Sequence, residues 1–71
     1  MKVRLRVKEL RREHPDKPTQ RFMAELLNMT ETNYRRLEGN QLDSVKLTHL
    51  SVLAEFFGCK DPNSIIEFIN D

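Results

Sequence analysis

The chain has 71 residues, of which 38% are hydrophobic and 32% are charged, and its formal net charge is +1. A chain this short forms one domain and buries only about 60% of its unfolded surface, which excludes a deep substrate pocket and argues against an enzyme. A single cysteine, Cys59, fits a reducing cytoplasm, and no apolar run is long enough for a membrane span or a signal peptide.

The first predicted element lies within residues 2–13. Apolar residues recur there at helical spacing with lysine and arginine between them, which predicts a first helix from about Leu5 onward. The alternation over Val3–Val7 is equally typical of an extended strand, so the sequence leaves the start of this element open. Pro15 and Pro18 lack an N–H and bias the preceding residue away from helix, so a loop is expected to follow.

Two short helices, at about residues 20–27 and 31–38, are predicted on either side of a tight turn. Thr19 and Thr30 stand where a hydroxyl can cap the first turn of each helix. Asn28 stands in the turn, where a left-handed backbone is expected and Asn tolerates it better than most residues. Together these elements predict a helix-turn-helix unit.

The helix-turn-helix unit, about residues 19–39, carries its own apolar stripe. The stripe comprises Phe22, Met23, Ala24, Leu26, Leu27, Met29, Tyr34 and Leu37. With the apolar residues of the second helix turned inward, a rotation of about 100° per residue points Thr32 and Arg36 furthest outward. Asn33 and Arg35 flank them, so the outer face of this helix is polar and basic.

Two further helices are predicted after Gly39. From about Val45 an apolar stripe indicates a fourth helix, which Gly58 ends. Asp61-Pro62 is typical of an N-cap followed by proline at the first helical position, so a fifth helix is predicted as far as Ile69. The expected fold class is therefore an all-α, compact five-helix bundle, formed by a single domain over residues 1–71.

These motifs together, in their order and spacing, resemble a Cro/lambda-repressor-type helix-turn-helix domain, also called the xenobiotic-response-element type. The matching residues are Leu10-Arg11, Thr19-Gln20, Ala24–Leu27, Asn28–Thr30, Arg36–Glu38, Leu50, Leu53-Ala54 and Phe57–Cys59. The resemblance covers nearly the whole chain. It implies a lambda-repressor-like bundle whose third helix, about residues 30–38, enters the major groove of DNA.

The chain departs from the family pattern at four places. The loop at residues 14–18 is longer than usual, Asn28 replaces the turn glycine, and Tyr34 replaces an aliphatic residue. The loop after Glu38 lacks the lysine and arginine that often touch phosphates in the family.

The candidate DNA contacts follow from the resemblance and from the outer face of the third helix. They are Gln20, Thr30, Glu31, Thr32, Asn33, Arg35 and Arg36. Arg36 is the best base-reading candidate, because a guanidinium can donate two hydrogen bonds to guanine, worth about 1–3 kcal/mol of discrimination. Arg35 and Gln20 are expected at backbone phosphates, and Glu31 is expected to pair with an arginine. The alternative for Arg36 is a surface arginine or a phosphate contact. For Thr32 and Asn33 it is ordinary helix surface, and for Gln20 it is a simple N-terminal residue of the helix.

Two structural roles are also predicted. Arg11 and Glu38 are expected to form a partly buried ion pair between the first and third helices, as the resemblance suggests. A candidate dimer surface comprises Ile65, Ile66, Phe68 and Ile69, although these residues could instead complete the core.

No metal site or cofactor is expected, because the spacing of His14, His49 and Cys59 matches no zinc pattern, and no small-molecule ligand is evident. Residues 1–36 carry ten Lys and Arg against five Asp and Glu, whereas residues 37–71 carry two against six. Such asymmetry allows one basic face to meet a polyanion.

We therefore predict a sequence-specific regulator of transcription that binds double-stranded DNA, as a homodimer reading half-sites about one helical turn apart. Its expected place is the cytoplasm of a bacterium, associated with the nucleoid, with a phage or plasmid as other origins. One alternative is a protein-interaction module, antitoxin-like or a phage adaptor, that uses the fold as a scaffold. Another is a structural protein that coats DNA without sequence preference.

Overall fold

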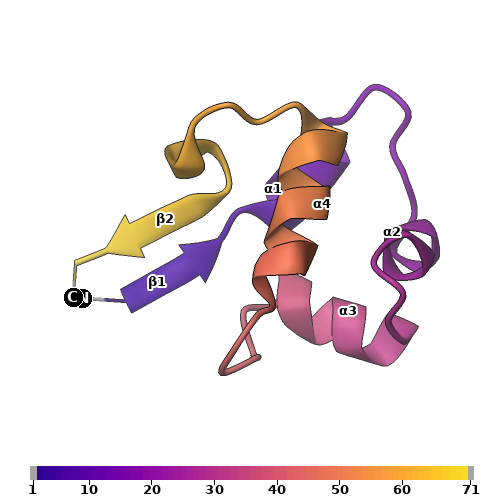
Figure 1. The fold of residues 1–71 in the computed structure, drawn as a ribbon, viewed down its shortest axis with the longest axis horizontal. Coiled ribbons are helices and arrows are strands. Elements are labelled where there is room, and N and C mark those ends of the chain that lie inside the picture. The colour runs from indigo at the N-terminus through magenta and orange to yellow at the C-terminus, as the bar shows by residue number, and fades with distance from the viewer. Residues whose placement is uncertain (1, 71) are drawn as a thin grey trace.

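The computed structural model describes residues 2–70, except for the side chain of Pro62. A short antiparallel sheet lies to one side of a group of four helices (Figure 1). The elements in chain order are β1 (Lys2–Leu5), α1 (Val7–Glu13), α2 (Gln20–Leu26), α3 (Glu31–Glu38), α4 (Leu47–Phe57), a 3₁₀ turn (Pro62–Ser64) and β2 (Ile66–Ile69).

The prediction of an all-α bundle with a fifth helix is wrong, because the segment expected to form that helix is the 3₁₀ turn followed by β2. β2 pairs with β1 in a register that sets Lys2 opposite Ile69 and Leu5 opposite Ile66. Isoleucine and phenylalanine favour a strand, and β1 offers this segment a partner for its backbone hydrogen bonds. The structure also decides how the N-terminal element begins. Residues 2–5 form the strand β1, and the first helix, α1, begins at Val7.

Capping threonines mark the starts of α2 and α3 as predicted. The hydroxyl of Thr19 accepts a hydrogen bond from the Phe22 N–H at 3.0 Å, and that of Thr30 accepts one from the Asn33 N–H at 3.1 Å. Asn28 has a φ of 55°, which is the left-handed conformation expected in the turn. α2, α3 and the turn between them therefore form the predicted helix-turn-helix unit.

The core lies between the helix-turn-helix unit, α4 and the inner ends of the two strands. Its buried hydrophobic residues are Leu5, Val7, Met23, Ala24, Leu27, Tyr34, Leu37, Leu53 and Ile65. Phe22 and Leu26 were expected in the apolar stripe of α2, but they are 46% and 38% exposed. A seven-residue helix turns one face to the core, and Met23, Ala24 and Leu27 already fill that face.

Candidate nucleic-acid interface

The outer face of α3 presents four exposed polar side chains. They are Thr32, Asn33, Arg35 and Arg36, and the opposite face of the helix buries Tyr34, Leu37 and Glu38. Each side chain therefore points as the helical periodicity predicted. What these four residues contact remains a prediction.

The two arginines of this face differ in their surroundings. Arg35 forms an ion pair with Glu31 at 2.5 Å, and its Nε donates a hydrogen bond to Oε1 of Gln20 at 3.2 Å. Gln20 in turn donates through Nε2 to the Glu38 carboxylate at 3.0 Å. The side chain of Arg36 makes no hydrogen bond or ion pair within residues 2–70. Its guanidinium is consequently available to an external acceptor.

Arg11 and Glu38 are in direct contact beneath this face. Nε of Arg11 donates to Oε2 of Glu38 at 2.6 Å and Nη2 donates to Oε1 at 3.2 Å, while the glutamate is only 4% exposed. Burial alone would raise the pKa of the Glu38 carboxyl, but Arg11, the nearby Tyr34 hydroxyl and Gln20 outweigh it and lower that pKa. The carboxylate therefore stays charged and joins α3 to α1 and α2.

A concavity of about 560 Å³ opens beside α3, between the start of that helix and the start of α4. Its lining residues are Asn28, Met29, Thr30, Asn33, Lys46 and His49, with no carboxylate among them. Lys46 is the last residue before α4, which begins two residues later than the sequence suggested. The loop after α3 therefore does carry a lysine next to the outer face, and Lys46 and His49 are candidate site residues that the sequence reasoning missed.

A comparison with protein-family models matches residues 4–71 to a Cro/C1-type HTH DNA-binding domain. The chain belongs to the Cro/C1-type HTH DNA-binding domain family. Comparisons with curated proteins and with solved structures gave no match. The predicted resemblance is thus confirmed, and the family is a DNA-binding one without enzymatic activity. In this Cro/C1-type domain, α2 and α3 are the helix-turn-helix.

The candidate dimer residues of the Cro/C1-type domain do not share one surface. Ile65 is 5% exposed and belongs to the core, and Ile66 packs partly against it. Phe68 is 61% exposed, and its partner in the strand register, Val3, is 60% exposed. The exposed apolar surface of the sheet is therefore the Val3–Phe68 pair at its outer end, where sequence reasoning had not placed Val3.

His14 and Cys59, which were considered as metal ligands, pack against other side chains in the structure. The ring of His14 stacks on Phe56 with centroids 4.9 Å apart, and Cys59 is partly buried against the core. Among residues 2–70 no group of three His, Cys, Asp or Glu side chains could hold a metal ion. No helix in the same range is long and apolar enough to cross a bilayer.

Proposed function

We propose that this Cro/C1-type domain is a sequence-specific regulator of transcription that inserts α3 into the major groove of double-stranded DNA. The observation that carries the proposal is Arg36, an exposed guanidinium on the outer face of α3 with no partner within residues 2–70. A guanidinium in the major groove can bind guanine O6 and N7 at once. An α-helix with its side chains is about 10–12 Å in diameter, which fits a major groove about 12 Å wide.

The remaining candidate residues take different parts in this arrangement. Thr32 and Asn33 present short polar groups to base edges, which the major groove distinguishes by their donors and acceptors. Arg35 is held by Glu31 and Gln20 at the side of α3, where a guanidinium meets a backbone phosphate. In this arrangement Gln20 orients Arg35, and the Thr30 hydroxyl caps α3.

Lys46 and His49 extend the proposed interface beyond α3. They line the concavity that also contains Asn33, and no carboxylate lies in it to repel a phosphate. A DNA strand that passes over α3 would run along this concavity. Lys46 would then add affinity and salt dependence without reading sequence.

We also propose that the regulator acts as a homodimer joined through the sheets. One reading helix gives a small interface, so tight specific binding calls for a second copy. The open edge of β2 and the exposed Val3–Phe68 pair supply a two-fold surface, since two β2 strands can pair antiparallel and bring the apolar pairs together. Replacing Phe68 with Ser should shift the protein to monomer in sedimentation analysis without unfolding it, because the side chain is largely exposed.

Selection of bound sequences from a random DNA pool tests the proposal for α3. The wild-type protein should enrich one motif, and Arg36→Ala should relax the preference at one base pair per half-site with a loss of about 1–3 kcal/mol. Arg12→Ala, an exposed arginine on α1, is the charge-matched control and should keep the motif. Equal binding to all sequences would contradict base reading, and no binding at low salt would contradict the DNA-binding role itself.

A further inference from the structure

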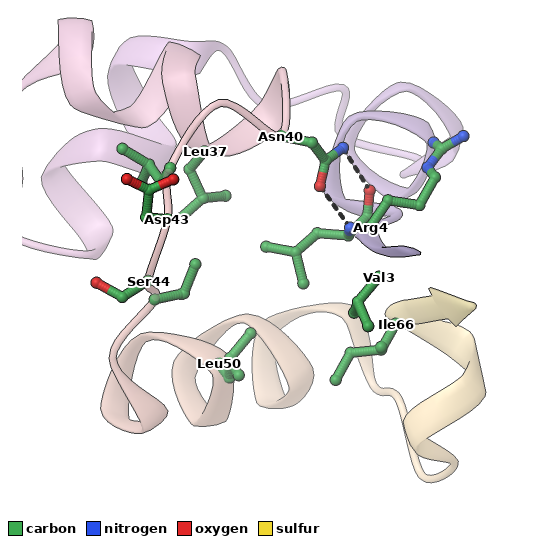
Figure 2. A pocket seen from close by; sticks show the side chains of 11 residues that line it. Val3, Arg4, Leu37, Asn40, Asp43, Ser44, Leu50 and Ile66 are labelled. Carbon is green, nitrogen blue, oxygen red and sulfur yellow. Dashed lines mark hydrogen bonds between the residues drawn. The ribbon is translucent and has the colours of Figure 1, made fainter. Parts of the chain in front are cut away.

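Asn40, two residues beyond the end of α3, holds the backbone of β1. The Leu5 N–H donates to Oδ1 of Asn40 at 2.6 Å, and Nδ2 of Asn40 donates to the Leu5 carbonyl at 3.2 Å. Figure 2 shows this pair of bonds at the rim of a pocket. The contact joins positions 35 residues apart and reaches the end of the sheet nearest the core.

The Asn40 amide takes the place of a third strand. In the β1–β2 ladder, the N–H and carbonyl of Leu5 point away from β2, because the neighbouring Arg6 N–H donates to the Ile65 carbonyl at 2.8 Å. A further strand would satisfy Leu5 with one peptide N–H and one peptide carbonyl. Asn40 supplies the same donor and acceptor from its side chain, and its φ of 57° aims the amide at β1.

Side chains do not completely fill the space between the sheet and α3. A pocket of about 260 Å³, partly open to solvent, lies between β1, the end of α3 and the loop before α4 (Figure 2). It is lined by Val3, Leu5, Leu37, Leu42, Ser44 and Leu50, among others. Side chains across a void make no mutual dispersion contacts, so they resist relative movement less than a close-packed core does. The two hydrogen bonds of Asn40 cross the edge of this pocket.

We infer that Asn40 is a positioning residue that sets the angle between α3 and the sheet, and with it the spacing of the two α3 helices in the homodimer. The inference rests on the proposed function, in which the sheets join the two copies and α3 reads DNA. Glu38 holds α3 to α1 and α2, so Asn40 is the polar link from the end of the same helix to the dimer element. A change of the angle at Asn40 moves both α3 helices of the homodimer. Because successive base pairs are only about 3.4 Å apart, such a movement changes which half-site spacing fits.

Asn40→Gly is the informative variant. Glycine adopts a positive φ without strain, so the backbone turn can persist while the amide is lost. Asn40→Asp keeps an acceptor for the Leu5 N–H but loses the donor to the Leu5 carbonyl, so an intermediate effect is expected. Asn28→Gly is the matched control, because Asn28 also has a positive φ but its side chain makes no hydrogen bond within residues 2–70.

Two measurements test the inference. Residual dipolar couplings of the free protein report the orientation of α3 relative to the sheet, and Asn40→Gly should change or average that orientation while Asn28→Gly leaves it as in wild type. Fluorescence anisotropy on DNA with half-sites moved apart in one-base-pair steps reports spacing. There Asn40→Gly should lower affinity at the preferred spacing about tenfold and keep affinity for a single half-site within about twofold.

The outcomes separate the inference from the proposed function. An unchanged orientation of α3 in Asn40→Gly overturns the inference whatever the DNA results are. An unchanged spacing preference in a variant whose orientation has changed overturns the link to half-site spacing. If the wild-type protein shows no spacing preference at all, the proposed homodimer fails and the spacing role fails with it, while the dipolar couplings still decide whether Asn40 sets the angle.

Discussion

Arg11 and Glu38 are joined by two hydrogen bonds, at 2.6 and 3.2 Å, between residues 27 positions apart in the chain. The glutamate is almost fully buried at the end of α3, and it also accepts a hydrogen bond from Gln20 of α2. Every group within reach of the carboxylate therefore favours its charged form. The orientation of α3 depends on this buried charge as well as on apolar packing.

Replacing Glu38 with Gln should lower the free energy of unfolding by about 3–5 kcal/mol, because the Arg11 guanidinium loses its buried counter-charge. Urea denaturation followed by circular dichroism measures the change. Glu31→Gln is the control, since it removes an exposed ion pair with Arg35 and should cost less than about 1 kcal/mol. Equal effects of the two substitutions would contradict a special role for burial at Glu38. If Glu38→Gln does not fold, Gln20→Ala removes one hydrogen bond to the same carboxylate and should cost about 1–3 kcal/mol.

The pH dependence of stability should carry the signature of Glu38. Its pKa is lower in the folded chain than in the unfolded chain, where glutamate titrates near about 4.3. The unfolded state thus binds a proton first as the pH falls, so this contribution is complete above the unfolded pKa and is lost as the pH falls through the folded one. Denaturation between pH 7 and pH 3 should show a steeper loss of stability for wild type than for Glu38→Gln. If the stability of both proteins falls equally with pH, another carboxylate is responsible for the loss of stability in acid.

The caps of the helix-turn-helix can be tested separately from its core. Thr30→Ala should cost about 1 kcal/mol, because the Asn33 N–H then loses its acceptor at the start of α3. Thr32→Ala changes the same residue type inside the exposed face of the helix and should stay within about 0.5 kcal/mol of wild type. Thermal denaturation of both variants checks the difference. A Thr30→Ala variant as stable as Thr32→Ala would mean that water replaces the cap.

The parts of this fold that the sequence predicted are those decided by neighbours along the chain. The caps Thr19 and Thr30, the left-handed Asn28 and the apolar spacing of α2 and α3 all act within a few residues of each other. The resemblance to the Cro family adds the order of the elements. Together they placed the helix-turn-helix and the direction of its outer face.

The parts that the sequence did not predict depend on contacts between distant segments. β2 is a strand because residues 2–5 offer it a ladder from the other end of the chain, and a run such as Ile66–Ile69 alone reads equally well as a short helix. Asn40 follows Gly39 at the end of α3, and nothing local marks its role, since its partner Leu5 lies 35 residues away in β1. Lys46 was assigned to a helix instead of the loop because nothing local marks the start of α4, whose N-cap makes no side-chain hydrogen bond.

Lys46 should contribute to DNA affinity through the phosphate backbone. It lies at the rim of the concavity beside Asn33, so a strand bound across α3 passes within reach of its ammonium group. A phosphate contact releases one condensed counterion, and Lys46→Ala should therefore weaken binding to all sequences alike and reduce the slope of log K against log salt by about 1. The measurement is anisotropy over a salt series with the selected motif and with an unrelated duplex.

Lys60→Ala is the matched control for this prediction. Lys60 is an exposed lysine in the segment between α4 and the 3₁₀ turn, outside the concavity, and its removal changes the net charge by the same amount. Long-range attraction by net charge would lower the slope equally in both variants, whereas a phosphate contact at Lys46 lowers it in Lys46→Ala alone. If Lys46→Ala instead changes the preferred base at one position with the salt slope intact, the lysine reads a base edge, and the DNA lies closer to α4 than the concavity implies.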